Sequence, residues 1–66
     1  MYREVLEEIY DELESAEKKL ARAHRLADDC DMVEHDVVDR IRKAWDIVRL
    51  LRIDISDELD ELGGDV

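Results

Sequence analysis

Apolar side chains recur at alternating steps of four and three residues through the first half of the chain. The alternation runs without interruption from Tyr2 to Cys30, which is the spacing of a heptad repeat and not the two-residue period of a strand. Two apolar rows result, one of Leu6, Leu13, Leu20 and Ala27, and the other of Tyr2, Ile9, Ala16, Ala23 and Cys30. The pattern predicts one helix over about residues 2–29, roughly 42 Å long at a rise of about 1.5 Å per residue.

The second half of the chain carries a similar stripe, which predicts a second helix over about residues 32–62. Its apolar positions are Val37, Ile41, Ala44, Val48, Leu51, Ile55 and Leu62, and Glu58 is the interruption. Asp31 and Glu34 have the spacing of a capping box, so Asp31 is the expected N-cap. Gly63 stands where a left-handed C-cap belongs. A continuous helix is the favoured interpretation; the alternative is a break near residues 54–56, with Ser56 capping a short third helix.

Two long helices joined by a short loop at about residues 30–31 must run antiparallel. We therefore expect an all-α fold with a single domain over residues 1–66, an antiparallel two-helix hairpin that packs like a coiled coil. Below roughly 70–80 residues a lone core seldom supplies more than a few kcal/mol of stability. The fold is therefore expected to be very regular, oligomeric, or completed by a partner protein.

The second helix has more apolar residues than one stripe requires. Val38, Trp45 and Leu59 widen the stripe on one side. Ile47, Leu50 and Ile53 lie about 100–160° from its centre, at about 100° per residue. We expect a homodimer that closes into a four-helix bundle through an apolar face made of Trp45, Ile47, Leu50 and Ile53. The alternative occupant of this face is a helix or groove of a different protein.

Composition restricts the partners and the environment of the protein. The formal net charge is −10 over 66 residues, so the chain lacks the excess of Lys and Arg that direct nucleic-acid binding needs. Apolar side chains never run longer than two in a row, so no contact with a membrane is expected. The acidic N-terminus differs from a signal peptide. The single cysteine, Cys30, fits a reducing, cytoplasmic setting, that of a host cell if the protein is viral.

Acidic side chains concentrate where the hairpin is expected to carry both termini. We expect this end to bind a basic surface of a partner protein through Glu4, Glu7, Glu8, Asp11, Asp54, Asp57, Glu58, Asp60 and Glu61. Residues 54–66 contain six acids and no base. Those acids lie at the negative end of the helix dipole, where cations are preferred, and a local cost of this kind is typical of functional sites. The alternative is that the acids only keep the protein soluble, or adapt it to high salt.

Catalytic and metal sites are not expected. The chain has no Gly-rich phosphate loop, and a thin hairpin offers no deep pocket for a substrate or cofactor. The protein is therefore not expected to be an enzyme. His24 and Asp28 share one face of the first helix, but the paired-cysteine and paired-histidine spacings of metal sites are absent from the sequence.

In length and layout the chain resembles Rop, the plasmid copy-control family of hairpins that dimerise into four-helix bundles. The resemblance covers architecture only. Rop-like RNA binding uses a polar and basic face of the first helix, and here that face carries Glu7, Glu8, Asp11, Glu14 and Glu17. In size and acidity the chain looks like phage-encoded DNA mimics, including some anti-CRISPR proteins. The expected function is a small acidic regulator or inhibitor that occupies the nucleic-acid-binding surface of a partner. The alternative is a structural homo-oligomerisation module without DNA mimicry.

Overall fold

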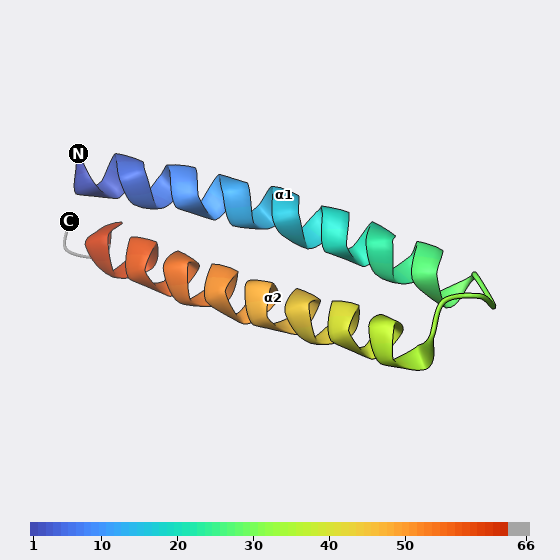
Figure 1. Ribbon diagram of the computed structural model, residues 1–66. Coiled ribbons are helices and arrows are strands. Elements are labelled where there is room, and N and C mark those ends of the chain that lie inside the picture. The colour runs from blue at the N-terminus through green and yellow to red at the C-terminus, as the bar shows by residue number, and fades with distance from the viewer. Residues whose placement is uncertain (64–66) are drawn as a thin grey trace.

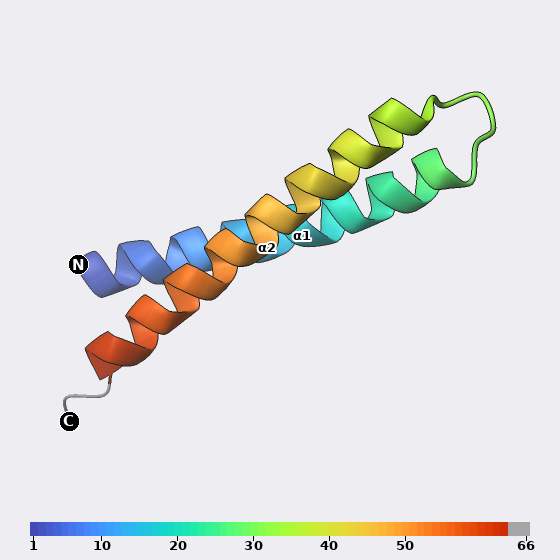
Figure 2. The same ribbon diagram turned by 90° about the horizontal axis from the view of Figure 1, so that it is seen from below.

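Two helices make up the computed structural model, which describes residues 1–63. α1 (Tyr2–Asp28) and α2 (His35–Gly63) run antiparallel and side by side (Figure 1). The hairpin measures 53 × 14 × 13 Å. A view turned by 90° shows the helices crossing at a shallow angle, with the start of α1 and the end of α2 at one end and the turn at the other (Figure 2). The all-α hairpin expected from the heptad spacing is confirmed, and no helix within residues 1–63 is long and apolar enough to cross a membrane.

α1 begins and ends nearly where the apolar pattern predicts. Met1 is its N-cap, and the Met1 carbonyl accepts the first helical hydrogen bond from the Val5 N–H at 3.1 Å. Glu4 lies in the first turn and Arg25 in the last, so each charge opposes the partial charge of the helix dipole at its own end. The helix ends at Asp28, and the Asp29 N–H still donates to the Arg25 carbonyl.

The connection between the helices is longer than predicted. α2 begins at His35 and not at residue 32, because residues 30–33 fold into tight turns. The Cys30 N–H donates to the Ala27 carbonyl at 3.3 Å, and the Val33 N–H donates to the Cys30 carbonyl at 3.1 Å. The prediction that Asp31 caps α2 is therefore wrong. The Glu34 carbonyl accepts the first hydrogen bonds of α2.

α2 is one uninterrupted helix from His35 to Gly63. The favoured continuous helix is confirmed, and the alternative break near Ser56 is not found. Gly63 itself is helical, and no glycine within residues 1–63 has a positive φ. The prediction of a left-handed cap at Gly63 is therefore wrong. Nothing basic lies in the last turn of α2.

The contact between the helices is narrow and partly polar. Leu6 and Ala27 are the buried apolar residues within 1–63, and Leu6 is 4% exposed. The row of α1 that contains them faces α2 as predicted. The second predicted row is turned to the side, where Tyr2 is 58% exposed and Ile9 39%. Ala16 and Ala23 of that row are half-buried, and so are Tyr10, Glu17 and His24 on the other side of the Leu6 row. The contact stripe of α1 is therefore made of the Leu6 row and its polar neighbours, and not only of the two apolar rows of the heptad.

Candidate functional site

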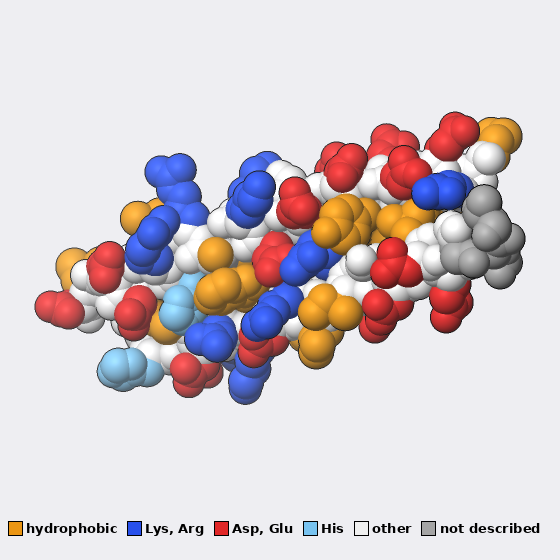
Figure 3. Space-filling model, turned by 180° about the vertical axis from the view of Figure 1, so that it is seen from behind, with side chains coloured by type: hydrophobic (Ala, Val, Ile, Leu, Met, Phe, Trp, Pro, Cys, Tyr) orange, Lys and Arg blue, Asp and Glu red, His pale blue; other side chains and the backbone are white. Residues whose placement is uncertain are grey.

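The hairpin brings the predicted acidic residues together at the end that carries both termini. The acidic end is defined by Glu4, Glu7, Glu8, Asp11, Asp54, Asp57, Glu58, Asp60 and Glu61, all exposed except the half-buried Glu58. Residues 1–15 and 47–63 carry eleven acids and three bases, whereas residues 16–46 carry eight acids and seven bases. Figure 3 shows acidic side chains gathered over the terminal end and basic ones nearer the middle. The acidic end therefore holds nearly all of the net charge.

Two members of the acidic end are held by contacts within the chain. The Tyr2 hydroxyl donates a hydrogen bond of 2.6 Å to Glu58 Oε1 across the two helices. This bond raises the pKa of the Tyr2 phenol, and burial against α2 acts in the same direction. Arg3 pairs with Glu7 at 3.2 Å. The other seven carboxylates of the acidic end have no hydrogen bond or ion pair within residues 1–63, namely Glu4, Glu8, Asp11, Asp54, Asp57, Asp60 and Glu61.

A polar cluster that the sequence interpretation missed joins the helices near their middle. Arg52 donates to Glu17 Oε2 through Nε, and to the Tyr10 hydroxyl through Nη1 at 3.2 Å. The side chains of Arg52 and Glu17 are only 23% and 19% exposed. Hydrogen bonds to Glu17 and then to Tyr10 raise the pKa of the Arg52 guanidinium. The signal in the sequence is the pair of seven-residue spacings that places Tyr10 and Glu17 on one row of α1, and Trp45 and Arg52 on one row of α2.

Trp45 lies between the helices and is half-buried. Its ring centroid is 5.9 Å from that of His24, and the Arg42 guanidinium carbon lies 5.3 Å from the ring centroid. The Trp45 Nε1–H is buried without a hydrogen-bond partner in the described chain. The other members of the predicted apolar face point outward, with Ile47 66% exposed, Leu50 62% and Ile53 38%. Of the four residues predicted to form one apolar face, Trp45 therefore lies between the helices and the other three lie on the outer surface.

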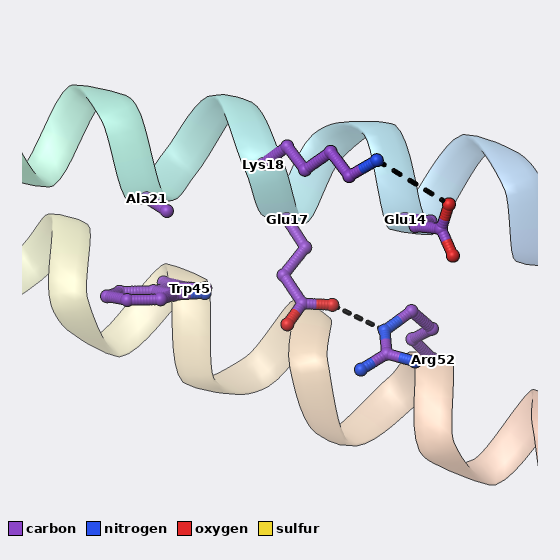
Figure 4. Close-up of a pocket in the computed structure, with 6 residues that line it drawn as sticks. All are labelled: Glu14, Glu17, Lys18, Ala21, Trp45 and Arg52. Carbon is purple, nitrogen blue, oxygen red and sulfur yellow. Dashed lines mark hydrogen bonds and ion pairs between the residues drawn. The ribbon is translucent and has the colours of Figure 1, made fainter.

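A shallow groove of about 370 Å³ runs beside Trp45. Figure 4 shows Trp45 and Glu17 pointing into the space between the helices, with Lys18 paired to Glu14 at the rim. The lining residues are Glu14, Glu17, Lys18, Ala21, Trp45 and Arg52. Because Arg52 and Glu17 already neutralise each other, the groove offers a ligand little unpaired charge.

The turn end of the hairpin shows no metal centre. Cys30 is exposed there, whereas the His24 ring is tilted against Trp45 between the helices. No group of three or more His, Cys, Asp or Glu residues within 1–63 is placed to hold a metal ion. No protein-family model, curated protein or solved structure matches the chain.

Proposed function

We propose that this chain is a small binding protein, a regulator or inhibitor, whose acidic end occupies a basic, nucleic-acid-binding surface of a partner protein. The observation that supports this function is the set of seven exposed carboxylates without an internal partner at that end. Such groups have no cation beside them in the described chain, and a strongly negative surface attracts a positive one over long range.

The charge density of the acidic end supports DNA mimicry. Residues 1–15 and 47–63 have a net charge of −8 and span about 24 Å of hairpin at about 1.5 Å per residue. This is about one net charge per 3 Å, compared with about one per 1.7 Å along duplex DNA. The two densities agree within about a factor of two. A surface that binds successive phosphates would therefore find carboxylates at comparable spacing, as it would on a phage-encoded DNA mimic or an anti-CRISPR protein of that type.

The same acids carry a cost within the fold. Asp60 and Glu61 lie in the last turns of α2, where the helix dipole is negative and no base is present. They also lie beside the acids of α1, so repulsion acts both along and between the helices. Retaining this many unpaired acids at one end is easier to understand if a cationic partner covers them.

The test is a pair of charge-reversed variants matched in net charge. One replaces Asp54, Asp57, Asp60 and Glu61 by Lys and keeps Glu58, because Glu58 holds Tyr2. The control replaces Asp28, Asp29, Asp31 and Glu34 by Lys at the turn end. Both change the net charge by +8, and circular dichroism checks that both stay helical.

Binding is measured against a panel of purified nucleic-acid-binding proteins, including CRISPR effector complexes, with duplex DNA as competitor. We expect the wild type and the turn-end variant to bind a member of the panel in a manner that DNA displaces, and the acidic-end variant to lose binding. If both variants bind as the wild type does, or if no member binds the wild type, the proposal is wrong.

A second candidate function is a structural homo-oligomerisation module, in which the acidic end only keeps the protein soluble. The exposure of Ile47 and Leu50 favours it, because large apolar side chains grouped on a surface mark association sites. Under this function the acidic-end variant would associate as the wild type does and would have no partner to lose.

A further inference from the structure

One side of the hairpin is apolar along both helices. At about 100° per residue, Val5, Ile9, Ala16 and Ala23 lie to one side of the α1 stripe that contacts α2. Val37, Ala44, Leu51 and Leu62 lie to the corresponding side of α2. Each row is displaced from its contact stripe in the same rotational sense about its own helix axis. Because the helices are antiparallel, this displacement places both rows on the same side of the hairpin. These eight residues define the apolar side.

The apolar side is exposed in the single chain. Its five large side chains, Val5, Ile9, Val37, Leu51 and Leu62, are each between 39% and 49% exposed. A shallow groove of about 330 Å³ follows the α1 part and is lined by Val5, Glu8, Ile9, Glu12 and Leu13. The Arg52 cluster lies on the opposite side of the contact stripe.

The exposed area of the hairpin matches what a dimer would remove. The chain exposes 5464 Å², whereas a compact protein of 7.8 kDa exposes about 4,400 Å². The excess is about 1,100 Å² per chain, and a standard protein interface buries about 800 Å² per partner. One interface of ordinary size would therefore bring the chain to the exposure of a compact fold.

We propose that a second copy of this chain covers the apolar side, with the two turns at opposite ends of the dimer. This interface differs from the face of Trp45, Ile47, Leu50 and Ile53 predicted from the sequence, and two members of the acidic end, Asp54 and Glu58, lie at its flank. In this arrangement a two-fold axis passes near Ala16, α1 packs on α1 of the second copy, and α2 packs on α2.

The sizes of the side chains fit this orientation. The α1 row is large near the termini, at Val5 and Ile9, and small toward the turn, at Ala16 and Ala23. About an axis near Ala16, residues whose numbers add to about 32 meet across the interface. Ile9 then packs on Ala23 of the second copy, and a large side chain faces a small one in both halves of the contact. Facing large and small residues is how helical cores interdigitate.

The charges that flank the apolar side select the same orientation. On α1, Glu12 meets Lys19 of the second copy. The axis passes near Arg49 on α2, so Arg40 there meets Glu58 of the second copy and Lys43 meets Asp54 of the second copy. With the turns at the same end, α1 would instead pack on α2 of the second copy, which places Glu12 against Asp54 and Glu8 against Glu58. Opposite charges therefore meet in one orientation and like charges in the other.

The native Cys30 allows a direct test without substitution, because it is exposed near the turn. A nitroxide label is attached to it, and the label separation is measured by pulsed electron spin resonance. The proposed dimer separates the labels by about 40 Å, because each lies about 14 residues from the axis at about 1.5 Å per residue. A separation below about 20 Å would show the turns at the same end. No dipolar coupling at any protein concentration would show that no dimer forms, and either result overturns the proposal.

A matched pair of variants tests which side is covered. Leu51→Glu and Leu50→Glu place the same charge at neighbouring exposed positions, but only Leu51 belongs to the apolar side. By sedimentation equilibrium we expect the wild type at about twice the chain mass of 7.8 kDa. Leu51→Glu should weaken dimerisation by at least about a hundredfold, because it buries unpaired charge near the axis. Leu50→Glu should remain a dimer. The reverse result, or no effect of either variant, overturns the proposal.

A charge swap covers the case in which Leu51→Glu fails to fold. Lys19→Glu changes an exposed residue at the flank of the apolar side and opposes it to Glu12 of the second copy. It should weaken dimerisation by about tenfold, and adding Glu12→Lys should restore it. A double variant no tighter than Lys19→Glu alone would exclude this pairing and the orientation that requires it.

Discussion

Replacing Leu6 by Ala should destabilise the hairpin more than any other single truncation in α1. Leu6 is 4% exposed, so the substitution removes about three carbon groups from an almost dry site, at about 0.8 kcal/mol each. Buried Leu→Ala substitutions cost about 2–5 kcal/mol, and the open sides of a two-helix contact allow solvent to fill the space. We therefore expect a loss of about 2–3 kcal/mol in the free energy of unfolding.

Leu26→Ala is the matched control, because Leu26 lies in the same helix and is 61% exposed. Its replacement should change the free energy of unfolding by less than about 0.5 kcal/mol. Both variants are unfolded in urea and followed by circular dichroism at one fixed protein concentration, because association makes apparent stability depend on concentration. If Leu6→Ala loses no more stability than Leu26→Ala, the assignment of Leu6 to the core of the hairpin is wrong.

Three further predictions concern the contacts between the helices. The hydrogen bond from Tyr2 to Glu58 needs the phenolic proton, and the pKa of the Tyr2 phenol is raised in the folded chain. The contribution of this hydrogen bond to stability should therefore be complete below a pH of about 10 and lost as the pH rises through the folded pKa. In a Tyr10→Phe background, absorbance at about 295 nm reports Tyr2 alone, and Glu58→Gln should lower its titration midpoint. Arg52→Met and Glu17→Gln should each lower the thermal midpoint measured by calorimetry, because either change leaves the other partner unpaired in a half-buried site. The double variant should lower the midpoint by less than the sum of the two single variants. Additive decreases would contradict the pairing. Trp45→Phe removes a buried N–H without a partner and should cost less than about 1 kcal/mol, whereas Trp45→Ala should cost about 2 kcal/mol; equal losses in urea denaturation would show that the indole N–H is satisfied after all.

The heptad spacing was sufficient to predict both helices, their antiparallel pairing and the continuity of α2 past Ser56. These properties depend on the local period of apolar residues, which is visible in one chain. The end that gathers the acids follows from the same pairing, since it requires only that the termini meet.

The heptad period did not predict which α1 residues, beside the Leu6 row, lie against α2. Tyr2 and Ile9 are more apolar than Tyr10, Glu17 and His24, yet Tyr2 and Ile9 are exposed and the three others are half-buried. Arg52 joins Glu17 and Tyr10 to α2, and the seven-residue spacing of Tyr10 and Glu17 does not by itself say which residue of α2 they will contact. Asp31 was missed as a turn residue for a similar reason, because a capping-box spacing is also compatible with two successive turns.

Met1 and Gly63, the first and last residues that the structure describes, lie at the acidic end, and this placement has a practical consequence for any binding assay. A purification tag or fluorescent protein fused at either terminus would stand next to the carboxylates through which we propose that the chain binds. A cationic tag would act as a competing ligand, and a bulky one would block access by its volume. Attachment at Cys30, at the opposite end of a hairpin 53 Å long, leaves that surface open, so immobilisation through the turn is the geometry in which a negative binding result can be interpreted.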